Sequence, residues 1–430
     1  MTLRLDSADE GFEARFAELL SSKRESSQDV SDTVAAIISD VRRRGDAAVL
    51  DYTNRFDRTN YAVDDLRIGP DAIATAAAGV SDRVRGALQT AHDRIKAHHE
   101  KQKPSDHIYT DALGVTLGTR WTPVDAVGIY VPGGLASYPS SVLMNAVPAK
   151  VAGVARIAMV VPTPDNEINP AILLAAQIAG VTEIYRIGGA QAIAALAYGT
   201  DTIASVDKVV GPGNAYVAAA KRQVFGQVGI DMIAGPSEVL VIADSSANPA
   251  WVAADLIAQA EHGAGARSIL VTTDRALADM VDREVDRQIA LLPDPTNARE
   301  GWDKYSAIIT VASLRQATDL ANRIASEHVE LALDDPRAIL DDIRHAGAIF
   351  IGHHTPEAIG DYVVGSNHVL PTAGTARFAS GLGVLDFMKR TSLLGCDPGS
   401  LSALAEAAEI LAEVEGLDGH GRSVSIRSNR

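Results

Sequence analysis

Four apolar segments decide the fold class: AVGIYVPGG at residues 126–134, IAMVVPTPD at 157–165, EIYRIGG at 183–189 and DKVVGPGN at 207–214. Each has the length of a buried strand and ends in a turn rich in Gly or Pro, and a helical pattern follows it. Apolar strands that alternate with helices are typical of a parallel sheet covered by helices on both faces. The four segments therefore predict an α/β lobe.

A second series of strands and helices follows the first. The predicted strands are EVLVIAD (238–244), SILVTTD (268–274), SAIITVAS (306–313), VELALDD (329–335) and GAIFIG (347–352). The predicted helices between them include residues 249–263, 275–292 and 314–326. We therefore expect a chain of the α/β class with two Rossmann-like parallel-sheet lobes.

The two ends of the chain differ from the lobes in their sequence pattern, which is mainly helical. Helical periodicity runs through most of the first 105 residues and through the tail, which is too short to form its own core. We expect a helical N-terminal region at 1–125 that packs on the second lobe, and a helical tail at 385–430. Between them lie the first lobe, 126–237, and the second lobe, 238–384.

The composition limits the classes of partner. The 430 residues include 39 Lys and Arg against 55 Asp and Glu, which gives a formal net charge of -16. Such an acidic surface repels phosphate backbones and anionic lipid, so we expect neither nucleic acid nor membrane as a partner. The single cysteine, Cys396, cannot form an internal disulfide, and we expect it to be buried. The start of the chain does not resemble a secretory signal, which favours a cytoplasmic protein.

Three Gly-rich turns are candidates for binding a nucleotide. They are Pro132-Gly133-Gly134, Gly188-Gly189 and Gly211-Pro212-Gly213-Asn214, and each connects a predicted strand to a helix. Ligands of parallel sheets bind at the carboxyl ends of strands, where glycine lets the backbone approach a phosphate. None of the turns has the GxGxxG pattern, so their residues alone favour tight turns without a ligand over nucleotide binding.

Several polar residues are candidates for chemistry. Gln259 and His262 share one face at the end of a predicted helix, where the helix dipole favours a cation, although His262 could also be a simple cap. Glu327 and His328 precede a predicted strand and could remove a proton or activate water, or could be a surface charge and a half-buried histidine. Asp361 and His420 lie in polar segments. Spacing alone does not predict that these residues bind a metal.

Longer strings give these residues a common context. They include VGIYVPGGLASYPSSVLMNAVPAKVAGV (127–154), RIGGAQAIAALAYGT (186–200), VDKVVGPGNAYVAAAKRQVFG (206–226), LIAQAEHG (256–263), SEHVEL (326–331) and GSNHVLPTAGTARFASGLGVLDFMKR (365–390). Together they resemble histidinol dehydrogenases. The resemblance implies zinc-containing, NAD-dependent homodimers with an aldehyde-dehydrogenase-like architecture. These enzymes oxidise L-histidinol to L-histidine through L-histidinaldehyde, the last step of histidine biosynthesis.

The resemblance also assigns roles to residues of this chain. It implies one Zn²⁺ per subunit and one catalytic pair, with NAD and substrate contacts on either side. The implied metal ligands are Gln259, His262, Asp361 and His420, the NAD contacts Tyr130, Gln191 and Asn214, and the catalytic pair Glu327 and His328. The implied substrate contacts are the metal ligands, the catalytic pair, Ser237 and Glu415, and the family places Glu415 and His420 in the neighbouring subunit's site. One departure is the segment Gly263-Ala264-Gly265-Ala266, because the family commonly follows QAEHG with Pro-Asp.

Other functions make different demands on the sequence. An aldehyde dehydrogenase with a cysteine nucleophile would need Cys396 in its active site, and an enzyme for a related amino alcohol would use the same residues. A zinc hydrolase would keep the metal ligands without NAD. A binding protein that closes two lobes on a small ligand would not need the Glu327–His328 pair.

Overall fold

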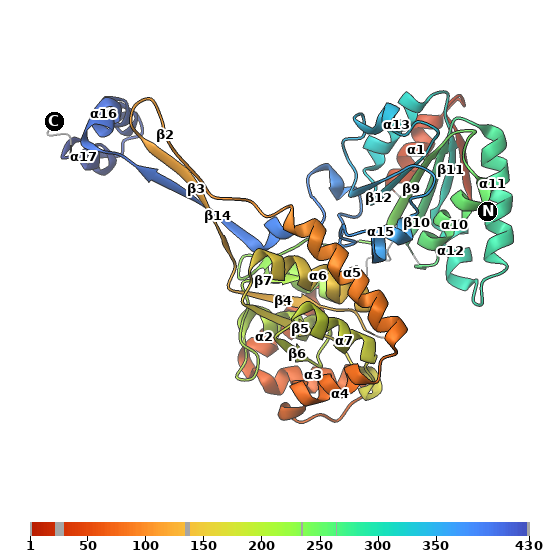
Figure 1. The fold of residues 1–430 in the computed structure, drawn as a ribbon, viewed down its shortest axis with the longest axis horizontal. Coiled ribbons are helices and arrows are strands. Elements are labelled where there is room, and N and C mark those ends of the chain that lie inside the picture. The colour runs from red at the N-terminus through yellow and green to blue at the C-terminus, as the bar shows by residue number, and fades with distance from the viewer. Residues whose placement is uncertain (1, 22–29, 134–137, 234, 264, 428–430) are drawn as a thin grey trace.

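The computed structural model describes residues 2–21, 30–133, 138–233, 235–263 and 265–427. Two α/β lobes lie side by side, and a long arm projects from them (Figure 1). Gly134 of the first turn, and Ala264 in the departure from the family pattern, lie outside the described residues.

The first lobe contains a five-stranded sheet in the order β6-β5-β4-β7-β8, and every pair of neighbours is parallel. Its strands are β4 (Ala126–Tyr130), β5 (Arg156–Val160), β6 (Glu183–Tyr185), β7 (Lys208–Val210) and β8 (Gly229–Ile230). The connecting helices are α6 (Pro139–Ala152), α7 (Pro170–Ala179), α8 (Gly189–Tyr198) and α9 (Ala215–Val224). The prediction of a parallel sheet from the apolar strands is confirmed.

Helices from the N-terminal region cover both faces of this sheet. They are α2 (Ser31–Arg44), α3 (Asp46–Asp57), α4 (Pro70–Ala78) and α5 (Asp82–Glu100). Helices α4 and α5 pack with α6 and α7 on one face, and α2 and α3 pack with α8 and α9 on the other. The expectation that residues 1–125 pack on the second lobe is therefore wrong for 31–100, because the apolar sides of these helices match the first sheet.

The second lobe contains a six-stranded parallel sheet in the order β1-β11-β10-β9-β12-β13. Its strands are β1 (Leu3–Asp6), β9 (Glu238–Ala243), β10 (Arg267–Thr272), β11 (Ala307–Thr310), β12 (His328–Ala332) and β13 (Ala348–Ile351). The helices are α1 (Phe12–Ser21), α10 (Pro249–Ala260), α11 (Arg275–Ile289), α12 (Thr296–Tyr305), α13 (Leu314–Ile324), α14 (Arg337–Leu340) and α15 (Glu357–Tyr362). Strand β1, which we did not predict, is the edge strand beside β11.

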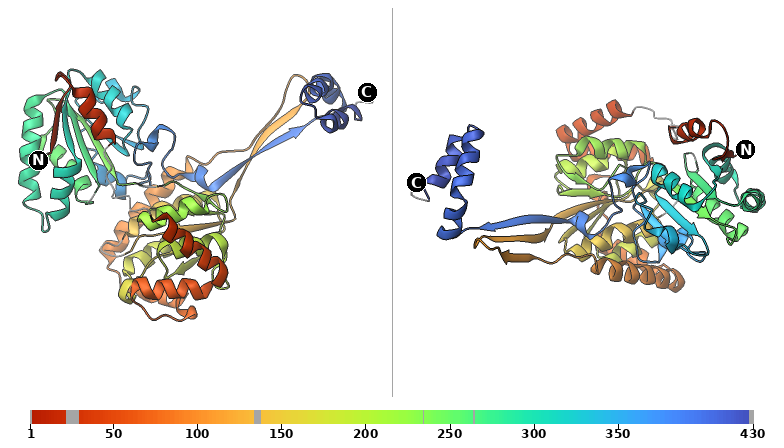
Figure 2. Two further views of the ribbon diagram at one scale, coloured as in Figure 1. Left: turned by 180° about the vertical axis from the view of Figure 1, so that it is seen from behind. Right: turned by 90° about the horizontal axis from the view of Figure 1, so that it is seen from above.

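The arm is an antiparallel ribbon that ends in two helices (Figure 2). The ribbon consists of β14 (Met388–Gly395), β3 (Thr116–Pro123) and β2 (His107–Thr110), and α16 (Pro398–Val414) and α17 (Asp418–Ser425) lie at its end. The tail from residue 385 is therefore not helical throughout. The expectation for Cys396 is also wrong, because it is exposed just after β14. Short 3-10 turns complete the chain at Val63–Asp65, Pro164–Asn166, Thr375–Arg377 and Val384–Phe387.

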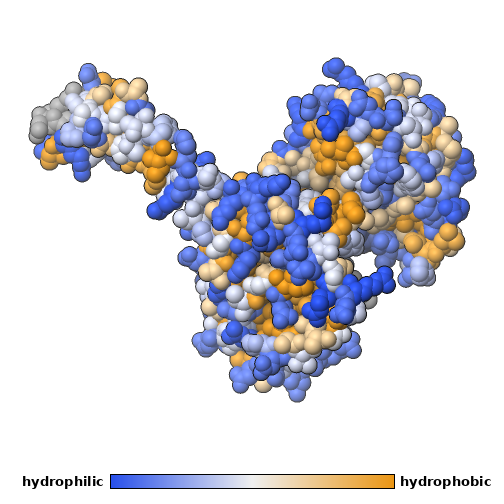
Figure 3. Space-filling model, in the orientation of Figure 1, coloured by the Kyte–Doolittle hydropathy of each residue, from blue (hydrophilic) through white to orange (hydrophobic). Residues whose placement is uncertain are grey.

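Apolar side chains are visible on the projecting arm (Figure 3). Leu394 is 77 % exposed and Val414 is 80 % exposed, and Leu411 is also exposed. Large apolar side chains on a projecting element are typical of a surface that another molecule covers. Within the described residues, no helix is long and apolar enough to span a membrane.

Gly211, directly after β7, is required by the packing of the first lobe. Its φ is +108°, and a Cβ at this position would lie 2.1 Å from the carbonyl oxygen of Tyr130 at the end of β4. Gly226 has a similar φ of +103°, but a Cβ there would meet nothing within 4 Å. Comparing substitutions at the two glycines therefore distinguishes the cost of backbone strain from the cost of steric overlap.

We expect Gly226→Ala to show only the cost of a positive φ, about 1–2 kcal/mol. Gly211→Ala should carry this cost and also displace β4, so its loss of melting temperature should be at least about twice as large. Thermal unfolding followed by circular dichroism measures both. Equal losses would show that the contact with Tyr130 relaxes without cost.

Candidate active site

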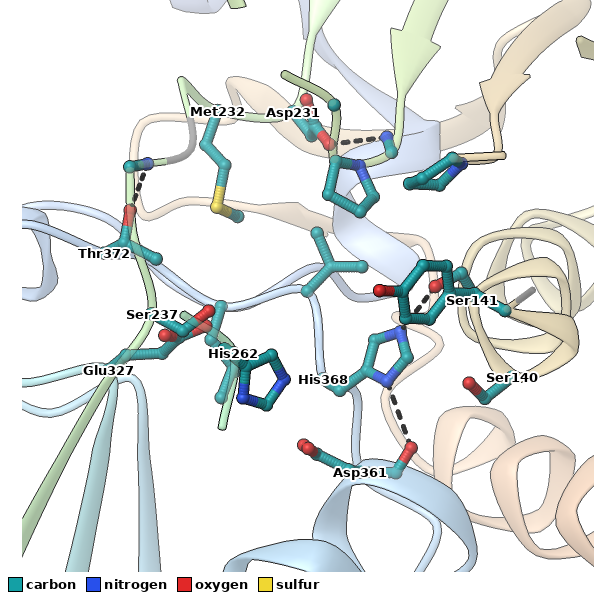
Figure 4. Close-up of a pocket in the computed structure, with 18 of the residues that line it drawn as sticks. Ser140, Ser141, Asp231, Met232, Ser237, His262, Glu327, Asp361, His368 and Thr372 are labelled. Atoms are coloured by element: carbon teal, nitrogen blue, oxygen red, sulfur yellow. Dashed lines mark hydrogen bonds between the residues drawn. The ribbon is translucent and has the colours of Figure 1, made fainter. Parts of the chain in front are cut away.

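A cavity of about 320 Å³ lies between the two lobes, and we call it the interlobe cavity. The first lobe contributes residues that include the turn Gly211–Asn214, and most of the polar side chains come from Ser237 and the second lobe (Figure 4). The polar residues on this side that line the cavity include Ser237, Gln259, His262, Glu327, His328, Glu357, Asp361 and His368.

The two lobes present opposite ends of their sheets to the cavity. The Gly211–Asn214 turn follows β7, at a carboxyl end, as we expected. Ser237 directly precedes β9, Glu327 directly precedes β12, and His328 is the first residue of β12. The second lobe therefore uses the amino ends of its strands, which differs from our general expectation of carboxyl ends.

Helix α10 brings Gln259 and His262 to the cavity. Gln259 is 0 % exposed, and neither atom of its amide group has a hydrogen-bond partner. The Nδ1 atom of His262 lies 3.1 Å from the carbonyl oxygen of Ala258 and 3.2 Å from that of Gln259. A carbonyl only accepts, so Nδ1 carries the proton and Nε2 keeps its lone pair. The amide oxygen of Gln259 and Nε2 of His262 are therefore lone-pair atoms that could bind a cation.

Glu327 and His328 form a buried pair at the start of β12. The Oε2 atom of Glu327 accepts a hydrogen bond of 3.0 Å from the backbone N–H of Glu238, and His328 Nδ1 donates to the Glu238 carbonyl at 3.0 Å. The Nε2 atom of His328 is buried without a hydrogen-bond partner and lies 3.6 Å from Asp361 Oδ1. Nε2 is therefore the imidazole nitrogen that the backbone does not hold.

Burial and mutual charge set the ionisation of this cluster. Burial raises the pKa of Glu327 to about 7 and that of Glu357 to about 8. Burial lowers the pKa of His328, but the nearby carboxyl groups of Glu357, Glu327 and Asp361 outweigh this effect and raise it well above its ordinary value. The pKa of Asp361 is lowered despite burial, because the imidazole of His328 lies beside its carboxylate and favours the ionised form. Groups that exchange protons near neutral pH are typical of catalytic sites.

Helix α15 and the segment after it contribute residues that we did not single out. His368 donates from Nδ1 to the Asp361 carbonyl at 3.0 Å, and its Nε2 lies 3.3 Å from Ser141 Oγ in the first lobe. Glu357 lies 3.4 Å from His328 Nδ1. Its position four residues before Asp361, on one face of a helix, is a signal in the sequence that could have identified it.

The expected NAD contacts lie on the first lobe at different depths. Asn214 lines the interlobe cavity, where its Oδ1 caps α9 by accepting from the N–H groups of Tyr216 and Val217. Tyr130 and Gln191 are buried beside the neighbouring turns. The Tyr130 hydroxyl accepts from the Gly189 N–H at 3.1 Å, and Gln191 Oε1 has no hydrogen-bond partner.

A buried ion pair between Lys221 and Asp231 holds the Gly211–Asn214 turn. Lys221 Nζ donates to the Gly211 carbonyl at 3.0 Å, and Asp231 Oδ2 accepts from the Gly211 N–H at 2.8 Å. The backbone N–H and carbonyl of Gly211 are therefore both held by this buried ion pair. The turn is positioned before any ligand arrives.

His420 and Glu415 do not join the other predicted site residues in the same chain. Both lie in the helical end of the arm, which projects away from the lobes (Figures 1 and 2). Of the four residues expected to bind a metal, Gln259, His262 and Asp361 thus line one cavity of the same chain. His420 lies on the projecting arm.

Comparisons with known proteins agree on one family. A family profile described as histidinol dehydrogenase matches residues 20–428. The histidinol dehydrogenase of Rhizobium meliloti (strain 1021) is 61 % identical over 429 residues, which cover 100 % of this chain and 99 % of that protein. That of Rhodospirillum rubrum is 59 % identical over 431 residues, with coverage of 100 % and 99 %. The crystal structure of histidinol dehydrogenase from Elizabethkingia anophelis is similar with a TM-score of 0.95 and 37 % identity, and the match covers 99 % of this chain and 98 % of that one.

The raised pKa of Glu357 predicts a specific dependence of stability on pH. Because burial raises this pKa from 4.5 to about 8, the contribution of Glu357 to stability is fully present below pH 4.5 and is lost as the pH rises through 8. Gln cannot ionise. The melting temperature of Glu357→Gln relative to the unmodified protein should therefore rise by several degrees between pH 5 and pH 8.5. The exposed Glu10→Gln is the control, and a flat difference for Glu357→Gln would contradict the assignment.

Proposed function

The chain belongs to the histidinol dehydrogenase family, and from this premise we propose that the interlobe cavity oxidises L-histidinol to L-histidine through the aldehyde, with NAD and zinc. The family membership identifies an oxidoreductase of the last step of histidine biosynthesis. The observation that carries the proposal is the buried Glu327–His328 pair, which lines the same cavity as the unpaired amide of Gln259.

Gln259, His262 and Asp361 would hold the zinc ion together with His420 of the partner subunit. The orphaned amide of Gln259, the free Nε2 of His262 and the carboxylate of Asp361 are a donor set that zinc accepts. When bound, zinc would supply a Lewis acid that holds the imidazole and amine of the substrate. Ser237, and Glu415 of the partner subunit, would contact the same substrate.

Tyr130, Gln191 and Asn214 would hold NAD across the strand ends of the first lobe. The buried Gln191 Oε1 without a partner fits an absent ligand, and the clamped Gly211–Asn214 turn fits a preformed binding site. When bound, NAD would accept the hydride in each of the two oxidations.

Residues of this chain would then accept the protons that the two oxidations release. His328 would take the alcohol proton at Nε2, because Nδ1 is already bonded to the Glu238 carbonyl. Glu327, with a pKa of about 7, would remove a proton from the water that adds to the aldehyde. His328 would assist the second oxidation in the same way. No thiol is needed in this scheme, and Cys396 is exposed at the far end of the arm ribbon.

We further propose that two chains form a symmetric dimer in which each arm completes the partner's site. The apolar residues exposed on the arm and the remote positions of Glu415 and His420 support this arrangement. A dimer with an isologous interface would contain two such composite sites.

Turnover can be measured by absorbance at 340 nm on adding L-histidinol and NAD. We expect two NADH per histidinol, no turnover after chelation of the metal, and recovery with zinc. One NADH per histidinol would indicate a simple alcohol dehydrogenase. Hydrolysis without NADH would indicate a zinc hydrolase, and ligand binding without turnover would indicate a binding protein. Full activity after thorough removal of the metal would contradict the ligand assignment.

Complementation tests the composite site. Glu327→Ala and His420→Ala should each be nearly inactive alone, because each damages every site of its own homodimer. In a mixed dimer one site receives both defects and the other receives neither. Random exchange makes half of the dimers mixed, so activity should return to about a quarter of the unmodified level. If exchange is confirmed and no activity returns, the arm serves its own subunit.

A further inference from the structure

The ion pair between Lys221 and Asp231 lies in the wall of the interlobe cavity. Lys221 belongs to α9 and Asp231 directly follows β8, and their side chains are 3 % and 1 % exposed. Neither is among the residues expected to bind metal or to accept protons. A buried ion pair adds little stability relative to two apolar side chains of similar volume, because its charges must leave water. Stability alone therefore does not explain why charged residues occupy these positions.

The polar atoms of the pair converge on one residue, Gly211. Lys221 Nζ donates to its carbonyl at 3.0 Å, and Asp231 Oδ2 accepts from its N–H at 2.8 Å (Figure 4). Gly211 also lies close to the end of β4, where a Cβ would come 2.1 Å from the carbonyl oxygen of Tyr130. The N–H, the carbonyl and the Cα of Gly211 are therefore all in close contact with the first lobe.

Helix α9 holds the other end of the turn as well. Asn214 Oδ1 accepts from the N–H groups of Tyr216 and Val217 at 3.1 and 3.2 Å. Gly213 packs so closely on α9 that a Cβ there would lie 2.4 Å from a methyl carbon of Val217. The helix therefore contacts the turn at Gly211 through Lys221, and at Asn214 through the cap.

A turn that is already fixed favours ligand affinity. A loop that becomes ordered only on binding reduces the free energy of binding, whereas a preorganised loop does not. The Gly211–Asn214 turn follows β7 at a carboxyl end of the sheet and includes Asn214, which we expect to contact NAD. The backbone of a Gly-rich turn at this place can approach a phosphate closely. Movement of Gly211 would therefore displace the groups that meet the cofactor.

We propose that Lys221 and Asp231 are positioning residues for NAD that act through Gly211. This inference rests on the proposed function. The pair holds the Gly211–Asn214 turn in the conformation that binds the cofactor, so NAD binds without having to order the turn. Loss of the pair should weaken the binding of NAD and NADH and leave substrate binding nearly unchanged. Asp231 also begins the segment that leads to Ser237, so an equal effect on L-histidinol would indicate a different role.

The test replaces both partners with apolar residues of similar volume, Lys221→Met together with Asp231→Leu, in the zinc-loaded enzyme. The melting temperature should stay within a few degrees, because no charge is left unpaired. The Kd of NADH, measured by its fluorescence without substrate, should rise at least about tenfold, since Gly211 loses both partners. KM for NAD should rise by a similar factor, while kcat and KM for L-histidinol should change less than about twofold.

Two further variants are the controls. Asp231→Asn keeps an oxygen that accepts from the Gly211 N–H, so the Kd of NADH should stay within about threefold of the unmodified value. Arg156→Met together with Glu183→Leu removes a partly buried ion pair of the same lobe, at the amino ends of β5 and β6. This second double variant should leave the Kd of NADH unchanged.

Hydrogen exchange tests the turn without any ligand. In the unmodified protein, a peptide that contains Gly211 should exchange the amide hydrogen of this residue slowly, because Asp231 accepts it. The Lys221→Met, Asp231→Leu variant should exchange it faster. Rapid exchange in the unmodified protein that slows only when NADH binds would show that the cofactor itself orders the turn. That result would overturn the inference even if the double variant does not fold.

The outcomes separate this inference from the proposed function. If the unmodified enzyme does not give two NADH per histidinol, the proposed function is wrong. If it does, and loss of the pair leaves the Kd of NADH unchanged, the positioning role is wrong while the proposed function stands. An equal rise in KM for L-histidinol and for NAD also overturns the inference. So does a loss of NADH affinity that follows the melting temperature across all the variants, because it shows a structural role.

Discussion

Burying an imidazole among carboxyl groups costs free energy unless the charges compensate one another, and this constraint shapes the centre of the molecule. His328 is held between Glu327, Glu357 and Asp361, and backbone groups of Glu238 fix both Glu327 and His328. The cluster draws on β9, β12 and α15 together. Its geometry therefore depends on the completed second sheet, and no short segment could form it alone.

The lobes meet with opposite ends of their sheets. The amino ends of the strands of one sheet face the carboxyl ends of the other, so acidic and imidazole side chains line the same cavity as the Gly211–Asn214 turn. His368 and Ser141 join the two sides at 3.3 Å, and Asn367 Nδ2 donates to the Met144 carbonyl at 2.6 Å. The cavity is thus held by polar contacts between the lobes as well as by the two cores.

The sequence is most informative where burial is complete. The strands of both sheets can be predicted because helices cover both faces, which leaves apolar runs without alternation. Strand β1 could not be predicted in this way. Its sequence LRLD alternates between apolar and charged residues, and its strand conformation depends on pairing with β11. Strand β14 could not be predicted either, because MKRTSLLG is mostly exposed and is not an apolar run. Gln259, Asp361 and Glu327 come from separate elements, so their spacing carries no information, and a resemblance in the longer strings was needed to connect them.

The pairing of β1 with β11 has a consequence for synthesis on the ribosome. Leu3 pairs with Ala307, so β1 leaves the ribosome long before the strand that it pairs with. The described strands of the first lobe's sheet, β4 to β8, are contiguous in the sequence, and such local contacts form early. Translation therefore favours an order in which the first lobe matures while the N-terminal strand waits. Closing the second sheet at the β1 edge is then a late event, because it needs β11.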